Sequence, residues 1–188
     1  MKQFKDIIRK LEWEDYYDPT FDWGGFELYK NNQLSEDFIR EFQNKIDWEY
    51  ISRCQKLSED FIREFQNKVD WYWVARYQTL SEDFIREFKN KLNLYVISIE
   101  QKLSEDFIRE FQDEVGWLYI SKCQKLSEEF IREFKYKVDW HFISECQKLS
   151  EDFIREFQDK VVWRYISEYQ TLSEDFKEEF KDKINFKN

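Results

Sequence analysis

The 188-residue sequence holds little glycine, proline, histidine or cysteine: it has three Gly, one Pro, one His and three Cys. Collagen-like chains and flexible linkers are excluded, because both need far more Gly and Pro. Intrinsic disorder is disfavoured, because 8 Trp, 11 Tyr and 19 Phe supply apolar surface to bury. No apolar run approaches the roughly 20 residues that span a bilayer. We therefore expect a soluble chain that is intracellular and cytoplasmic.

The scarcity of His and Gly also argues against an enzyme. A Ser-His-Asp constellation would have to use His141, the one histidine. No Gly-rich phosphate-binding loop is present. The N-terminal acids Asp15, Asp18 and Asp22 do not match the alternating ligands of a calcium loop. We expect no catalytic residues, no metal site and no cofactor.

A repeat of 23 residues dominates the rest of the sequence. The motif Leu-Ser-Glu-Asp-Phe begins at residues 34, 57, 80, 103, 149 and 172, and residue 126 begins a variant with Glu in place of Asp. Six full repeats cover residues 34–171, and residues 172–188 form a truncated seventh. We number the places within a repeat from 1 (Leu34) to 23 (Lys56). Self-similarity at a fixed period predicts one continuous stacked-repeat domain.

Each repeat is predicted to form two short helices. Apolar places four residues apart drift by about 40° per step, so one long helix could not cover its stripe with a neighbour. Two helix starts resolve this, because Ser35 precedes Glu36 and Asp37 in one first turn and Asp47 precedes the other. We expect a first helix of roughly ten residues (helix A) and a second of roughly eight (helix B), each marginal alone. The fold prediction is all-α: an α-solenoid of stacked αα-hairpins.

The spacing also predicts which side chains are buried. In the first repeat the apolar arc of helix A holds Phe38, Ile39, Phe42 and Ile46, and that of helix B holds places 15, 17, 18 and 21: Trp48, Tyr50, Ile51 and Cys54. Cys123 and Cys146 share place 21, so all three cysteines are predicted to be buried, reduced thiols. They lack a CxxC spacing and are expected to lie too far apart for a disulfide. Ion pairs Glu36–Arg40 and Glu41–Lys45 should neutralise the outer face of helix A.

The two ends differ from the repeats. Residues 1–33 are predicted to form N-terminal capping helices joined by a loop that holds Pro19 and two Gly. In the seventh repeat, Lys177 stands at place 6, where all six full repeats have Ile. A polar side chain there suits a terminal repeat that no further neighbour covers.

The net negative charge of the chain bears on which classes of partner it can bind. The 30 basic and 40 acidic residues give a net charge of −10, and no repeat is net positive. Nucleic-acid and anionic-membrane binding need basic surfaces, so we expect neither. The columns of Glu36 and Asp37 equivalents could instead imitate a phosphate backbone, although Arg stands one turn away in each full repeat.

Helix B offers the most variable surface. Places 16 and 20 are predicted to face outward, and their residues differ between repeats, so a partner could be recognised there. With two large aromatics near the N-terminus, the candidate partner-binding residues are Glu49, Tyr72, Tyr95, Leu118, His141, Arg164, Arg53, Arg76, Ile99, Lys122, Glu145, Glu168, Phe21 and Trp23. Tyr72, Trp73 and Tyr77 make the second repeat unusually aromatic, and aromatic side chains are enriched in binding hot spots.

The unit LSEDFIREFQ…DW.YIS..QK resembles short tandem helical repeats of uncharacterised proteins from large DNA viruses, phages and some bacteria. The resemblance implies a viral or mobile-element origin and a binding role in the host cytoplasm. Recent duplication and a consensus-engineered array would both give such near-identical units. We expect a non-enzymatic scaffold that binds an unknown protein partner. The alternatives are a counter-defence inhibitor or sponge, acting as an acidic nucleic-acid mimic or charged-ligand trap, and a structural spacer or self-assembling rod.

Overall fold

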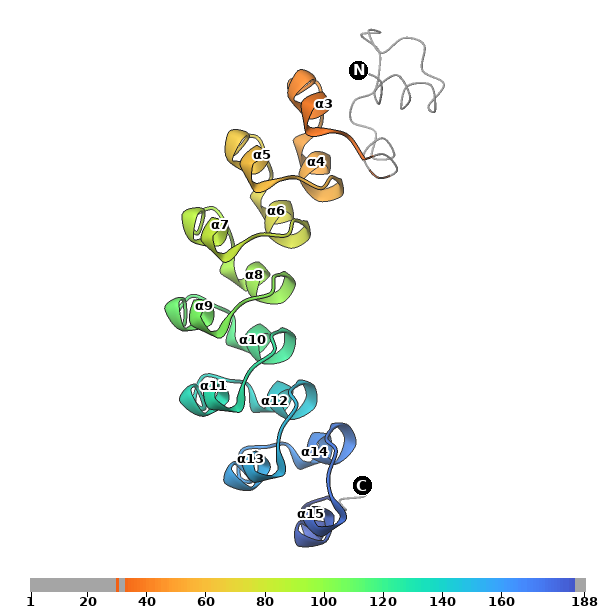
Figure 1. The fold of residues 1–188 in the computed structure, drawn as a ribbon, viewed down its shortest axis with the longest axis vertical. Coiled ribbons are helices and arrows are strands. Elements are labelled where there is room, and N and C mark those ends of the chain that lie inside the picture. The colour runs from red at the N-terminus through yellow and green to blue at the C-terminus, as the bar shows by residue number, and fades with distance from the viewer. Residues whose placement is uncertain (1–29, 31–32, 185–188) are drawn as a thin grey trace. The chain divides into compact units, whose positions relative to one another are not determined.

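The computed structural model describes residue 30 and residues 33–184. The predicted N-terminal capping helices, together with Phe21 and Trp23, lie outside the described residues. The chain divides into two compact units, residues 1–93 and 94–188, and the boundary falls inside the third repeat. Within the described part there are 14 helices and no strand. In each unit the helices recur with the period of the repeat and neighbouring repeats stack (Figure 1), which confirms the predicted α-solenoid of two-helix repeats.

Every described full repeat contributes one helix A and one helix B. In the first unit the A helices are α3 (Glu36–Glu41), α5 (Glu59–Glu64) and α7 (Glu82–Glu87), and the B helices are α4 (Trp48–Cys54) and α6 (Trp71–Tyr77). In the second unit the A helices are α9 (Glu105–Glu110), α11 (Glu128–Glu133), α13 (Glu151–Glu156) and α15 (Glu174–Glu179). The B helices there are α8 (Leu94–Glu100), α10 (Trp117–Cys123), α12 (Trp140–Cys146) and α14 (Trp163–Tyr169), and α16 (Lys181–Ile184) ends the described chain.

The predicted caps begin the helices. The Ser35 hydroxyl accepts the backbone N–H of Phe38 at 3.2 Å, and Asp47 Oδ1 accepts the N–H groups of Glu49 and Tyr50 at 2.9 and 3.2 Å. Helix A is shorter than predicted, with 6 residues instead of roughly ten. It ends because Phe42 leaves helical geometry at φ −103°, ψ 17° and its carbonyl then closes the turn into helix B. Helix B has 7 residues.

Helix A supplies most of the apolar core. In the second repeat Phe61 and Ile62 are fully buried, and Phe65 and Val69 are 6% exposed, as predicted for places 5, 6, 9 and 13. The Trp at place 15 packs onto the next repeat: the Trp48 ring lies 4.9 Å from Phe65 and 6.2 Å from Phe61, between centroids. The aromatic rings therefore join helix B of one repeat to helix A of the next.

The buried arc of helix B was predicted wrongly in part. Ile51 and Ser52 at places 18 and 19 are fully buried and Gln55 at place 22 is 2% exposed, so the arc is turned toward places 19 and 22. Place 21 lies at its edge: Cys54 is half-buried, while Cys123 and Cys146 are exposed. The prediction of buried thiols is therefore wrong, because the arc was assigned from apolar residues alone.

Two buried polar side chains replace the expected thiols in the stack. The carboxamide of Gln78 accepts the Leu57 N–H at 2.9 Å and donates to the carbonyls of Ser52 and Gln55 at 2.9 and 2.8 Å. Ser52 Oγ donates to the Trp48 carbonyl at 2.7 Å and accepts the N–H of the next repeat's place 14 at 2.9 Å. Gln124 and Gln147 repeat the same bonds in the second unit. Within each unit these buried hydrogen bonds join one repeat to the repeat before it.

The seventh repeat is polar where the others are covered. Ile at place 6 is fully buried in each of the six full repeats, whereas Lys177 at that place is exposed and its ammonium group lies 2.7 Å from Glu174. The structure therefore confirms that place 6, which is buried in every full repeat, is exposed and polar in the seventh repeat.

Candidate partner-binding surface on helix B

The charges of helix A bind the repeats to one another. Arg40 lies 3.6 Å from Glu36, 3.0 Å from Asp37 and 2.8 Å from Glu64 of the next repeat. Its guanidinium carbon stands 5.0 Å from the centroid of the Phe61 ring. The hydrogen bond to Glu64 raises the pKa of the Arg40 guanidinium above its ordinary value. The pairing with the Glu of its own helix and with a Glu of the next repeat recurs at Arg63, Arg109, Arg132 and Arg155, so these charges join neighbouring repeats.

The predicted Glu–Lys pair within helix A is wrong in the second repeat. Glu64 accepts from Arg40 instead, and Lys68 reaches back to Gln43 and Asn44 of the preceding repeat at 2.8 and 3.1 Å. The Lys68 ammonium also lies 5.8 Å from the Trp48 ring. Spacing within a helix could not show this, because the competing partners belong to a different repeat.

Helix B presents an outer face, which we define as places 16, 17, 20 and 21. All six predicted residues at place 16 are exposed: Glu49, Tyr72, Tyr95, Leu118, His141 and Arg164. At place 20, Arg53, Arg76, Ile99, Lys122 and Glu168 are exposed, and Glu145 is half-buried. Seven large apolar side chains are exposed among the described residues, and six of them belong to this face: Tyr72, Tyr77, Tyr95, Ile99, Leu118 and Tyr169. The seventh, Tyr136, lies in a turn.

In the first unit the outer face carries a set of stacked side chains, which we call the aromatic–arginine cluster: Arg53, Tyr72, Trp73, Arg76 and Tyr77. Trp73 and Tyr77 stack with centroids 5.5 Å apart and planes at 16°. Arg53 lies 4.8 Å from the Trp73 ring and Arg76 lies 5.5 Å from the Tyr77 ring. Arg76 Nη1 also donates to the Tyr72 hydroxyl at 3.1 Å. Tyr72 and Tyr77 are each 48% exposed, so the cluster is open to solvent.

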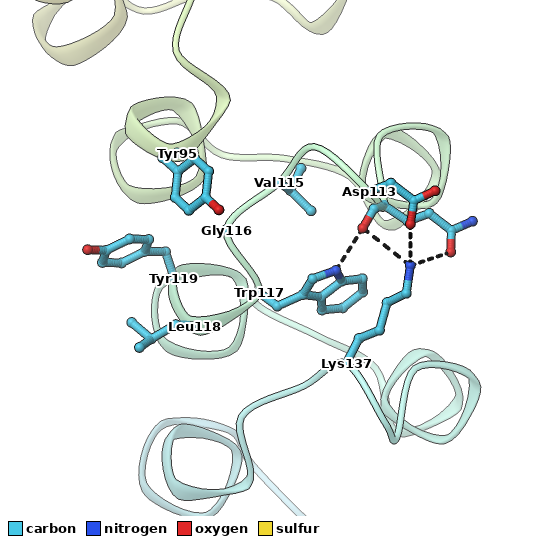
Figure 2. A pocket seen from close by; sticks show the side chains of 9 residues that line it. Tyr95, Asp113, Val115, Gly116, Trp117, Leu118, Tyr119 and Lys137 are labelled. Atoms are coloured by element: carbon cyan, nitrogen blue, oxygen red, sulfur yellow. Dashed lines mark hydrogen bonds and ion pairs between the residues drawn. The ribbon is translucent and has the colours of Figure 1, made fainter.

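In the second unit the outer face adjoins a shallow pocket of about 670 Å³ (Figure 2). Gly116 stands at place 14, and a Cβ there would lie 2.9 Å from the Tyr95 ring and 3.0 Å from the Tyr119 ring. Figure 2 shows Tyr95 directed toward Gly116, with Leu118 and Tyr119 on the same side. The absence of a side chain at Gly116 lets the Tyr95 and Tyr119 rings lie close to the backbone in the lining of this pocket.

The repeat pattern breaks around this pocket. In other repeats a Lys at place 12 covers the Trp of the preceding repeat, as Lys137 covers Trp117 at 5.8 Å. Before the pocket, Leu94 stands where the others have Trp, and Glu114 stands where the others have Lys. Both members of the cation–π pair are therefore replaced together. This paired replacement was readable in the sequence and marks the place where stacking differs.

At α12 and α14 the outer face combines rings with carboxylates. His141 Nε2 lies 3.8 Å from Glu145, and the His141 ring lies 4.6 Å from that of Tyr165. The nearby charge of Glu168 and its hydrogen bond raise the pKa of Tyr169 above its ordinary value. His141 is thus a surface residue within an aromatic group, which agrees with its variable place.

The thiols at place 21 are accessible to different degrees. Partial burial is the main cause that raises the pKa of Cys54 and Cys146 above the ordinary thiol value. A raised pKa leaves less thiolate at neutral pH, and the thiolate is the reactive form. Burial therefore favours the protonated thiol at Cys54 and Cys146.

Among residues 30 and 33–184, no three His, Cys, Asp or Glu side chains come together as ligands for a metal ion, and no helix has the length and apolar character needed to cross a membrane. Comparison with known proteins adds no relative: no family model, no curated protein and no solved structure matches the chain.

Proposed function

We propose that the chain is a non-enzymatic helical-repeat scaffold that binds a protein partner in the cytoplasm through the outer face of helix B. One observation carries the proposal: among the described residues, six of the seven exposed large apolar side chains lie on that face. They also occupy places whose identity differs between repeats. Tyr, Trp and Arg dominate binding hot spots, and the aromatic–arginine cluster brings all three together.

The division of tasks between the helices supports the same proposal. The invariant polar side chains of helix A bind the neighbouring repeat, as Arg40 does with Glu64 and as Glu36 does with the Ser58 N–H at 2.7 Å. The acidic column is thus engaged by arginines and backbone donors of the array, which makes a nucleic-acid mimic the weaker candidate. A spacer would need no exposed aromatic side chains, because such side chains raise the risk of aggregation.

Site-specific photo-crosslinking tests the proposal. A photoreactive phenylalanine is placed at Tyr95 or Leu118 on the outer face, and at Asp83 as the control. Asp83 is a good control because its side chain is 93% exposed on helix A. We expect one protein of defined mass to be captured from both outer-face positions and not from Asp83. Equal capture from all three positions, or capture from none in any lysate of a host that expresses the chain, contradicts the proposal.

A further inference from the structure

We propose that Lys135, Tyr136 and Lys160 in the second unit form a binding site for a phosphate monoester, the group carried by a phosphorylated protein side chain or by a mononucleotide. We call these three residues the lysine–tyrosine site. They lie in the turns that follow α11 and α13 and not on the outer face of helix B. The inference therefore goes beyond the proposed function and does not rest on it.

The lysine at place 12 of a repeat usually donates to oxygen acceptors in the repeat before it. Lys137 donates to Gln112 Oε1 at 3.0 Å and to Asp113 Oδ1 at 2.7 Å. Lys183 donates to Gln158 Oε1 at 3.0 Å. The lysines at place 12 of the second and third repeats make the same kind of bond in the first unit. Places 10 and 11 of one repeat thus hold the ammonium group of the next.

Lys160 has no such acceptor, because Lys135 and Tyr136 stand at places 10 and 11 of the preceding repeat. No hydrogen bond or ion pair joins either ammonium group to any residue of the described part of the chain. Each group lies instead near the Tyr136 ring, at 5.0 Å from its centroid for Lys160 and 5.3 Å for Lys135. Two positive charges thus lie beside one ring, within about one Debye length (~10 Å at 0.1 M) of each other.

This pairing of two lysines occurs at one junction of the array. Place 10 holds Gln in four of the full repeats and Lys in the other two, at Lys89 and Lys135. The repeat after Lys89 has Glu114 at place 12, so the two places still carry opposite charges. The repeat after Lys135 keeps Lys160 there. The excess of positive charge is therefore specific to the lysine–tyrosine site.

The carboxylates that lie nearest in sequence leave the site open. Glu133 and Glu156, which precede the two turns, are paired at 2.9 and 2.7 Å with the arginines at place 7 of the preceding repeats. Asp159 adjoins Lys160 in sequence, but no ion pair joins their side chains. Lys160 is exposed and Lys135 is half-buried. An anion from solution can therefore approach both lysines without displacing an existing ion pair.

The donors of the site match a phosphate monoester better than a carboxylate. At pH 7 a phosphate monoester carries about −1.5 to −2 charges and three strong acceptor oxygens, so it can balance both ammonium groups. Tyr136 is 83% exposed, which leaves its hydroxyl open to a third oxygen. Lysine binds phosphate as a point charge, without the paired geometry that arginine needs. A long phosphate backbone would also meet the acidic remainder of a chain whose net charge is −10.

Fluorine NMR of the intact chain tests the site. 3-Fluorotyrosine is incorporated in place of Tyr136 alone and, in a reference sample, in place of Tyr169, which is 51% exposed on α14. The probes are the end-blocked peptides Gly-phosphoserine-Gly and Gly-Glu-Gly, and adenosine monophosphate, at pH 7 and constant ionic strength. We expect a saturable shift of the signal at position 136 and none at position 169. The midpoint should be about fivefold or more lower for the phosphopeptide than for the Glu peptide, because phosphate carries nearly twice the charge.

Two matched variants separate the site from general charge. Lys135→Gln restores the residue that precedes most lysines of place 12, so Lys160 regains its usual acceptor and the phosphopeptide should bind about tenfold or more weakly. Lys125→Gln makes the same change in net charge at an exposed lysine of the same unit. It should keep the midpoint within about twofold of the wild type, because screening limits distant charges. Circular dichroism establishes that each variant is folded.

The two phosphate probes distinguish the sources of the group. A lower midpoint for the phosphopeptide supports a phosphorylated protein as the source, and a lower midpoint for adenosine monophosphate supports a nucleotide. The inference is overturned if neither probe shifts the signal at position 136, or if the Glu peptide binds as tightly as the phosphopeptide. It is also overturned if Lys135→Gln leaves the midpoint unchanged or if Lys125→Gln weakens binding as much. None of these results bears on the proposed function, which crosslinking from helix B tests separately.

Discussion

Removing one buried glutamine side chain from the second unit should cost as much stability as a core truncation. Gln124 is 6% exposed, accepts the Leu103 N–H at 3.0 Å and donates to the carbonyls of Ser98 and Gln101 at 2.9 and 2.8 Å. Each bond contributes about 1 kcal/mol net, and a buried group left without a partner costs about 1–3 kcal/mol. We therefore expect Gln124→Ala to lower the free energy of unfolding by about 3 kcal/mol.

The chain contains its own comparison for this change. Gln170 makes the same three bonds at 3.0, 3.1 and 2.8 Å, but it is half-buried beside the truncated repeat. Water can satisfy the groups that Gln170→Ala would leave, so we expect a loss of about 1 kcal/mol there. Lys125→Ala, at the exposed neighbouring residue, should change little. Urea unfolding followed by circular dichroism gives all three values. An equal loss for Gln124→Ala and Gln170→Ala, or a loss below about 1 kcal/mol for Gln124→Ala, would refute the reasoning.

Four further substitutions test two helix caps, the polar place in the seventh repeat and one carboxylate. Val162 is the N-cap residue of α14 and its side chain makes no cap hydrogen bond. Val162→Asp should therefore raise the free energy of unfolding by about 1 kcal/mol, and Asp139→Val should lower it by a similar amount, as measured by thermal unfolding. Lys177→Ile exposes an apolar side chain at an uncovered place, so sedimentation velocity should show more self-association than in the wild type, and an unchanged monomer fraction contradicts this. The backbone N–H of Ser173 donates to Glu151 at 2.6 Å and lowers the pKa of that carboxyl below its ordinary value. The stability that this bond contributes is therefore present above the unfolded pKa and is lost as the pH falls through the folded pKa, so the destabilisation caused by Glu151→Gln at pH 7 should shrink as the pH is lowered.

Local signals were enough to predict the repeating hairpin. Ser35 and Asp47 accept backbone N–H groups as their places before apolar runs indicate. Helix A was predicted too long because the apolar pattern continues through Phe42 to Ile46 while the backbone has already turned. Apolar spacing records which side chains are buried, and it does not record where helical hydrogen bonding stops.

Contacts between repeats were harder to predict. The bond from Arg40 to Glu64 joins residues 24 apart, and the bond from Gln78 to Gln55 joins residues 23 apart. Their geometry depends on how one repeat sits on the next, which spacing inside a repeat does not contain. The signal that could have found them is invariance, because Gln fills place 22 in all six full repeats and Ser fills place 19 in five. A polar side chain that never varies in an array with other variable polar places is a candidate for a buried contact.

The same logic explains why partner candidates could be named from sequence while the pocket could not. Places 16 and 20 vary because the stacking of repeats depends little on them. Their side chains are exposed to solvent, except that Glu145 is half-buried. The pocket is lined by Gly116 and by the Tyr95 ring of the preceding repeat, and spacing within one repeat does not show how these two lie. The outer face can therefore vary while Arg and Gln, which fill places 7 and 22 in all six full repeats, and Trp and Ser, which fill places 15 and 19 in five, hold neighbouring repeats together within each unit. A partner surface built on helix B can diversify without a loss of stacking energy, whereas one built on helix A could not.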